Sequence, residues 1–127
     1  MNTFSMNGYI WKIQFVDSDN PMLMDRTGTQ TVATTDPKTQ IIYLSNELYG
    51  EFLVKVLLHE LGHCALISFD LLEEIHRVVK PKYWIEAEEW LCNFLVDYGF
   101  TIFRTAYSIF GFEAWKLIPY ELDRLVA

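Results

Sequence analysis

An apolar helical stretch that carries three titratable residues constrains this chain most. Residues 56–63 read VLLHELGH, so His59, Glu60 and His63 stand inside an otherwise aliphatic segment. Residues four apart on an α-helix lie on one face, one turn from each other. A fold that holds this segment must satisfy two imidazoles and a carboxylate beside its core, because burying such groups without partners is costly.

The spacing of these groups indicates a metal centre. Two imidazoles one helical turn apart can bind the same cation, while Glu60 points about 100° away, toward a water in the site. In the pattern His-Glu-x-x-His the histidines are ligands and the glutamate is the general base. We expect Zn2+ as the cofactor, because histidine and glutamate ligands favour it among the common ions. Gly62 inside the helix indicates that another group approaches the backbone closely there.

A catalytic zinc also needs a third protein ligand and an open fourth position. Three glutamates compete in the segment WIEAEEW, at positions 86, 88 and 89. Helical phase puts Glu88 at the edge of the apolar stripe of a predicted helix, whereas Glu86 and Glu89 fall toward its polar face. We therefore predict Glu88 as the third ligand, with Glu89 as the alternative.

Other candidate ligands and zinc classes are weaker. His76 is expected to be an exposed residue on a short helix. Metzincins need Gly and His where this chain has Leu66 and Phe69, so that class is excluded. A deformylase-like site would need a cysteine before the motif, and none is present. The two cysteines, Cys64 and Cys92, are expected to be reduced, buried thiols, although either could act as a soft ligand.

The order of predicted elements indicates an α+β protein, because strands come first and helices follow. We expect a strand over residues 8–17, and a hairpin of residues 28–35 with 40–45 around the turn DPKT. Ser45 or Asn46 is expected to cap a first helical turn. Helices are predicted over 51–68, from 70 to before Pro81, over 83–98 with Gly99 as a left-handed cap, and in the tail, broken near Gly111 and Pro119.

Composition sets the broader limits. With 127 residues, of which 51% are hydrophobic, the chain fits one globular domain over residues 1–127. A formal net charge of −7 argues against nucleic acid and against an anionic membrane as partners. The N-terminus has no basic segment followed by an apolar run, and no apolar stretch reaches the ~18 residues of a membrane span. We expect a cytoplasmic protein.

Three segments together resemble a known group of enzymes. They are QIIYLSNEL, VLLHELGHCAL and EAEEWLCNFL. They resemble the ImmA/IrrE-like branch of the zinc metallopeptidases, and small phage or mobile-element proteins of the gluzincin type. The resemblance implies a minimal zincin-like fold, with a small N-terminal antiparallel sheet of about three strands before the active-site helix and a third-ligand helix after it. It also implies metal ligands at His59, His63 and Glu88, and a general base at Glu60.

The expected function is hydrolysis of peptide bonds in a protein or peptide substrate. Related peptidases hold the substrate as an extra strand at a sheet edge, and residues 41–44, IIYL, are the expected edge here. A cationic or phenolic donor usually stabilises the oxyanion, and Tyr98, Arg104 and Tyr107 are candidates for that role.

Two alternatives stay open at this point. The chain could be a binding or accessory protein that keeps a metal only for stability, with a fourth protein ligand such as Cys92 and an aromatic-rich tail that covers the cleft or binds a partner. It could also be a zinc hydrolase of a small amide, in which case the groove beside residues 41–44 would be short.

Overall fold

The computed structural model describes residues 3–116, which fall into two compact units divided between Val96 and Asp97. The first unit contains the sheet and three helices, and the second contains a helix and a 3-10 segment. A single domain over residues 1–127 stays a prediction. The strands are β1 (Thr3–Met6), β2 (Tyr9–Val16), β3 (Ala33–Asp36) and β4 (Ile41–Ser45). The helices are α1 (Gly50–Ser68), α2 (Leu72–Val78), α3 (Trp84–Phe94) and α4 (Phe100–Phe110), with short segments η1 (Pro21–Leu23), η2 (Pro81–Tyr83), η3 (Leu95–Gly99) and η4 (Gly111–Lys116).

The sheet is mixed, with four strands in the order β1-β2-β4-β3. β1 with β2 and β3 with β4 pair antiparallel, whereas β2 and β4 pair parallel, with Lys12 opposite Ile41. The prediction of an α+β protein is confirmed, but the prediction of an antiparallel sheet of about three strands is wrong. The reason is the return path of the chain: β3 runs back from the end of β2, and β4 then inserts between them, parallel to β2.

β1 is a strand that the sequence prediction missed, although the sequence carries a signal for it. Asn7 and Gly8 form the turn between β1 and β2, and both have positive φ, +48° and +83°. Asn-Gly is the preferred dipeptide of a two-residue hairpin turn, because both positions need the left-handed region. The alternating residues before this dipeptide therefore form the first arm of a hairpin.

β4 lies inside the sheet and not at its edge, so the expectation that residues 41–44 form the substrate-binding edge is wrong. β3 is the edge strand on this side of the sheet, within the residues described. β4 also contacts the η1 segment. Leu23 of η1 is fully buried, and Tyr43 of β4 is only 8% exposed.

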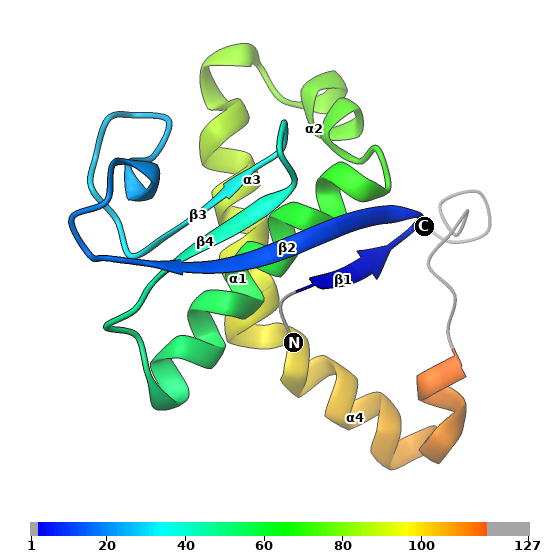
Figure 1. The fold of residues 1–127 in the computed structure, drawn as a ribbon. Helices are drawn as coiled ribbons and strands as arrows, with labels where there is room; N and C mark the ends of the chain where they lie inside the picture. The colour runs from blue at the N-terminus through cyan, green and yellow to red at the C-terminus, as the bar shows by residue number, and fades with distance from the viewer. Residues whose placement is uncertain (1–2, 117–127) are drawn as a thin grey trace. The chain divides into compact units, whose positions relative to one another are not determined.

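The helix α1 lies against one face of the sheet, as the ribbon shows (Figure 1). The core between them contains Trp11, Ile42, Leu44, Leu48 and Cys64. Trp11 Nε1 also donates a hydrogen bond of 2.9 Å to Ser68 Oγ in the last turn of α1. These contacts fix α1 over the sheet along its length, since burial of aliphatic and aromatic side chains is the main stabilising contribution.

The predicted helix termini differ from those observed in three places. α1 begins at Gly50 after Tyr49, whereas Ser45 belongs to β4, so neither Ser45 nor Asn46 caps the helix. α2 begins at Leu72, because Asp70 has a φ of +56° and interrupts the helical backbone. Gly99 is not a left-handed cap: its φ is −57°.

The helical backbone passes from α3 through the π-helical segment η3 into α4. α4 ends at Gly111, whose φ is +63°, as the sequence predicts, while Pro119 lies outside the described residues. Within the second unit, the rings of Phe103 and Trp115 meet edge to face at 4.9 Å, so η4 packs on α4. Of the helices in residues 3–116, none alone is long and apolar enough to cross a membrane, and only α1 with α2 passes as a pair, bent by 84°.

Candidate metal centre

The two histidines of the motif converge, as their spacing on α1 predicts. The Nε2 atoms of His59 and His63 are 3.2 Å apart, and the ring centroids are 4.9 Å apart. His63 is 8% exposed, so the pair is at the boundary between the protein interior and solvent. Two ring nitrogens that face each other at this distance are placed to share a proton or a cation.

Glu89 bridges the histidine pair. Its Oε2 lies 2.9 Å from His59 Nε2, and its Oε1 lies 3.2 Å from His63 Nε2. The side chain of Glu89 is 41% exposed, as expected for the polar face of the helix, but it also contacts both histidines, which that expectation did not include. The reason is the close packing of α3 on α1: a Cβ at Gly62 would lie 3.0 Å from Cys92 Sγ, so a residue beside the buried stripe can still reach the histidines.

Glu88 projects inward, as helical phase predicts, and is 4% exposed. Its Oε2 lies 3.6 Å from the other ring nitrogen of His63, Nδ1. The same oxygen lies 2.5 Å from Arg26 Nη2, yet it makes no hydrogen bond of regular geometry. The contact is therefore an ion pair, in which the short distance between opposite charges and not the alignment of a hydrogen bond provides the attraction. Glu88 as a metal ligand stays a prediction, while the Nε2 side of the pair faces Glu89.

Glu60 lies beside the ligand candidates and is hydrogen-bonded to β3. It is 5% exposed, and Thr35 Oγ1 on β3 donates a 2.8 Å hydrogen bond to its Oε1. Its Oε2 lies 3.8 Å from His59 Nε2. Burial raises the pKa of Glu60, and the nearby His63 and the Thr35 hydroxyl offset only part of that rise. A carboxyl group with a raised pKa is suited to take up and release a proton near neutral pH.

Arg26 and Thr35 are residues of this centre that the sequence analysis missed. Arg26 Nη2 contacts both Glu88 Oε2 and Glu89 Oε1, the latter at 3.2 Å. No pattern in the sequence marks a single arginine in a long connection as part of a site. Thr35 could have been found, because the predicted hairpin places its side chain on the same face as Ala33, which packs against the core below α1.

The acidic neighbours of His63 favour its charged form when no cation is bound. Burial opposes the charge on His63, but its contacts with Cys92, Glu88 and Glu89 outweigh that effect and raise its pKa to about 12. The hydrogen bond with His59, and after it the one with His63, hold the pKa of Glu89 well below its usual range. Burial raises the pKa of Glu88, but His63 and Arg26 outweigh that effect and lower it. A site of this kind can exchange a proton for a metal ion, since ligands must be deprotonated to bind.

The donor atoms present fit a zinc ion. The ligand atoms of His59, His63 and Cys92 lie within 4.8 Å of one another, and so do those of His63, Glu88 and Glu89. Imidazole, carboxylate and thiolate are the ligands that zinc takes in proteins. Neither cysteine forms a disulfide, and both are buried.

Tyr98, Arg104 and Tyr107 lie beyond the division between the units, so their role as oxyanion donors stays a prediction. Arg104 Nε donates a weak 3.4 Å hydrogen bond to Phe100 O within its own helix. His76 is exposed, as expected, and its ring stacks on Trp84 with the ring centroids 3.9 Å apart.

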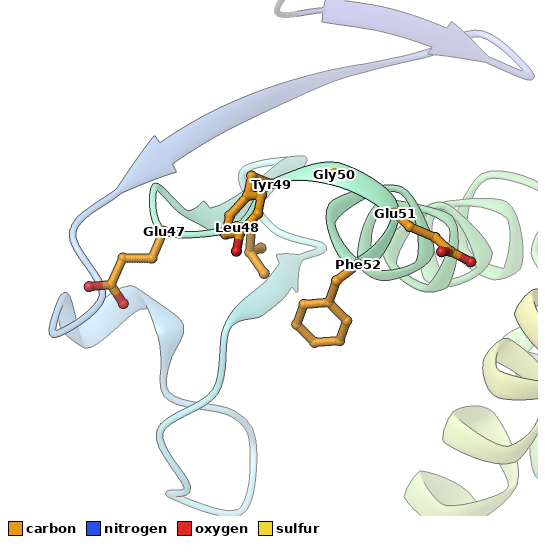
Figure 2. A pocket seen from close by; sticks show the side chains of 6 residues that line it. All are labelled: Glu47, Leu48, Tyr49, Gly50, Glu51 and Phe52. Atoms are coloured by element: carbon orange, nitrogen blue, oxygen red, sulfur yellow. The ribbon is translucent and has the colours of Figure 1, made fainter.

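A separate surface pocket of about 320 Å³ lies at the start of α1. It is lined by Glu47, Leu48, Tyr49, Gly50, Glu51 and Phe52. The two carboxylates lie at opposite ends of it, so they do not converge on one point (Figure 2). It shares no residue with the histidine cluster.

Comparison with models of protein families, with curated proteins and with solved structures gives no match. The resemblance to the gluzincin peptidases therefore stays a prediction. In the first unit, His59, Glu60, His63 and Glu89 form the cluster whose geometry bears on function.

Proposed function

We propose that the chain is a zinc-dependent metallopeptidase whose metal ligands are His59, His63 and Glu89. The observation that carries this proposal is the convergence of both Nε2 atoms on one carboxylate, at 2.9 and 3.2 Å. The position of Glu60 supports it: Thr35 holds one carboxylate oxygen, and the other lies 3.8 Å from His59 Nε2. A general base must be close to the ligands without being one. Glu88, the ligand expected from helical phase, instead faces Nδ1 of His63.

Each residue of the centre then has a chemical role. A zinc ion bound here supplies Lewis acidity toward a carbonyl oxygen and toward water. Glu60 accepts a proton from the attacking water and passes it to the leaving amine, a role that its raised pKa favours. Thr35 keeps the Glu60 carboxylate in place through its hydroxyl group. Glu88 and His63 share an ion-pair contact that keeps the imidazole ring in a fixed orientation.

The edge strand β3 is the place where a peptide substrate would align. Val32 O accepts a hydrogen bond from Ser45 N, and Asp36 O accepts one from Gln40 N, so these residues face β4. In an antiparallel pair, successive residues alternate between facing the partner strand and facing away from it. The backbone groups of Thr35, next to Asp36, therefore point outward from the sheet. A peptide added as a strand at that edge would pass beside Glu60, since the Thr35 side chain contacts it.

The test is to replace the general base and keep the metal. Glu60→Gln removes the proton acceptor, so we expect peptide cleavage to fall by several orders of magnitude while zinc content is unchanged. Cleavage is followed by mass spectrometry on a peptide mixture, and zinc by elemental analysis. Glu86→Gln, an exposed glutamate on α3, is the matched control and should retain full activity. Full cleavage by the Glu60→Gln chain would contradict the assignment.

A second function has an observation in its favour. Cys92 is fully buried beside His59 and His63, so a zinc held by the thiolate as well would have a closed coordination sphere. Such a chain would be a metal-stabilised binding protein without catalysis. Cys92→Ser separates the two proposals: the structural site would lose its zinc, whereas the peptidase would keep both zinc and cleavage. The same substrate screen, extended to small amides, distinguishes peptide from small-amide hydrolysis.

A further inference from the structure

A defined turn presents Arg26 to the metal centre. Asp25 Oδ1 accepts hydrogen bonds from Thr27 N at 2.8 Å, from Thr27 Oγ1 at 2.6 Å and from Thr29 N at 3.0 Å. Asp25 N also donates to Thr29 O at 2.9 Å, and Gly28 takes the positive φ of +85° that the turn requires. Arg26 therefore lies in a hydrogen-bonded turn, and these bonds fix its backbone independently of its side-chain contacts.

The guanidinium of Arg26 engages both glutamates of α3 through one nitrogen. Nη2 lies 2.5 Å from Glu88 Oε2 and 3.2 Å from Glu89 Oε1. Glu89 is thus held by one oxygen, while its other oxygen lies 2.9 Å from His59 Nε2. Glu88 is held between Arg26 and His63 Nδ1.

We infer that Arg26 is a positioning residue of the metal centre, a role that depends on the proposed zinc site. It retains Oε1 of Glu89 and so presents Oε2 to the cation. It also neutralises Glu88, which stays beside His63 Nδ1 and directs the unprotonated Nε2 toward the cation. Partners behind the ligands commonly orient them in this way, and their loss weakens metal binding by about 10- to 100-fold.

The sign of the effect separates this role from simple charge repulsion. A guanidinium near a cation repels it, so removal of a bystander arginine should strengthen zinc binding. Removal of a positioning residue should weaken it, because Glu88 and Glu89 would then lose the contact that orders them. The two possibilities predict changes in opposite directions.

The experiment is zinc titration of the full chain against a competing chelator, with Co2+ absorption spectra as the second measurement. We expect Arg26→Gln to lower zinc affinity by about tenfold or more and to change the Co2+ spectrum. Arg26→Lys should be intermediate, because one ammonium keeps the charge but cannot reproduce the planar guanidinium. Arg77→Gln is the matched control, since it removes an arginine–glutamate pair on the exposed face of α2.

A double substitution tests the route through Glu88. In a Glu88→Gln chain, the loss caused by Arg26→Gln should shrink, because neighbouring residues that act together are not additive. Circular dichroism of the chelator-treated variants checks the fold, and Arg26→Lys keeps the test valid if Arg26→Gln fails to fold. Unchanged or tighter binding in Arg26→Gln, with an unchanged spectrum, overturns the inference. A wild-type chain that binds neither zinc nor Co2+ overturns the proposed function instead.

Discussion

At the scale of single residues, the two glutamates of α3 differ in the histidine nitrogen that each one contacts. Glu89 lies against the Nε2 atoms of both histidines, and Glu88 lies near Nδ1 of His63. A metal-ligating histidine usually gives its other nitrogen to a carboxylate, which fixes the ring and its tautomer. Two adjacent glutamates on α3 can therefore serve the same ion from two sides, one directly and one through His63.

The two glutamates are expected to respond differently to substitution. Glu89→Gln should lower zinc affinity strongly, because it removes the carboxylate charge at the Nε2 pair. Glu88→Gln should lower it by only about 10- to 100-fold, since it removes a partner of His63. Competition with a chelator of known affinity measures both. The reverse order would make Glu88 the ligand, as helical phase alone predicts.

At the scale of elements, the approach of α3 to α1 decides how the centre is assembled. The two helices meet at Gly62, where an added Cβ would lie 3.0 Å from Cys92 Sγ and 3.4 Å from Leu95 Cδ1. Cys92 is fully buried and interacts with His63, so its sulfur has little room to move away. The missing side chain at Gly62 thus keeps Glu89 within reach of the histidines.

Substitution of Gly62 tests this packing. Gly62→Ala should destabilise the chain, because overpacking costs about 1–3 kcal/mol and exceeds the gain of about 1 kcal/mol in helix propensity. In a Cys92→Ala background the same substitution should be neutral or stabilising, since the sulfur is gone. Chemical denaturation of the four chains gives the comparison. Equal destabilisation in both backgrounds would show that Cys92 is not the obstacle.

Local signals explain which elements could be predicted. The turn around Pro37 and the motif around His59 are local, and both the hairpin and α1 follow from them. The parallel pairing of β2 with β4 could not be predicted in the same way, because it depends on the path of residues 17–32, which carry no regular pattern. The contact of Arg26 with α3 depends on that same path. Helical phase alone predicts that Glu88 points inward. The contact of Glu89 with the histidines depends on the distance between α3 and α1, which the sequence does not reveal.

At the scale of the whole molecule, every described contact of the metal centre comes from the first unit. The strands supply Thr35, the long connection supplies Arg26, and the helices supply the histidines and glutamates. Their charges interact, since Arg26 and His63 both contact Glu88 and Glu89. The stability of the metal-free chain should therefore depend on pH through this cluster.

The direction of that dependence follows from His63. Its pKa is raised from 6.5 to about 12 in the folded chain, so its stabilisation is complete below 6.5 and declines as pH rises toward 12. The lowered pKa values of Glu88 and Glu89 act oppositely: their stabilisation is present above 4.5 and is lost on acidification. We expect the melting temperature of chelator-treated protein to fall from about pH 6 to about pH 9. His63→Gln should flatten that decline, and an unchanged slope would contradict the assignment.

The parallel pairing of β2 with β4 also affects the order in which the centre can form. β2 can pair only after β4 has been synthesised, and the contact between Arg26 and Glu89 joins residues that are 63 positions apart. Contacts between such distant positions form slowly, because a long loop has to close first. During synthesis the histidines leave the ribosome well before the glutamates of α3, so a growing chain should capture zinc only weakly until residues 88 and 89 have emerged. If the proposed zinc site is right, metal loading should then be the last event in the maturation of the first unit.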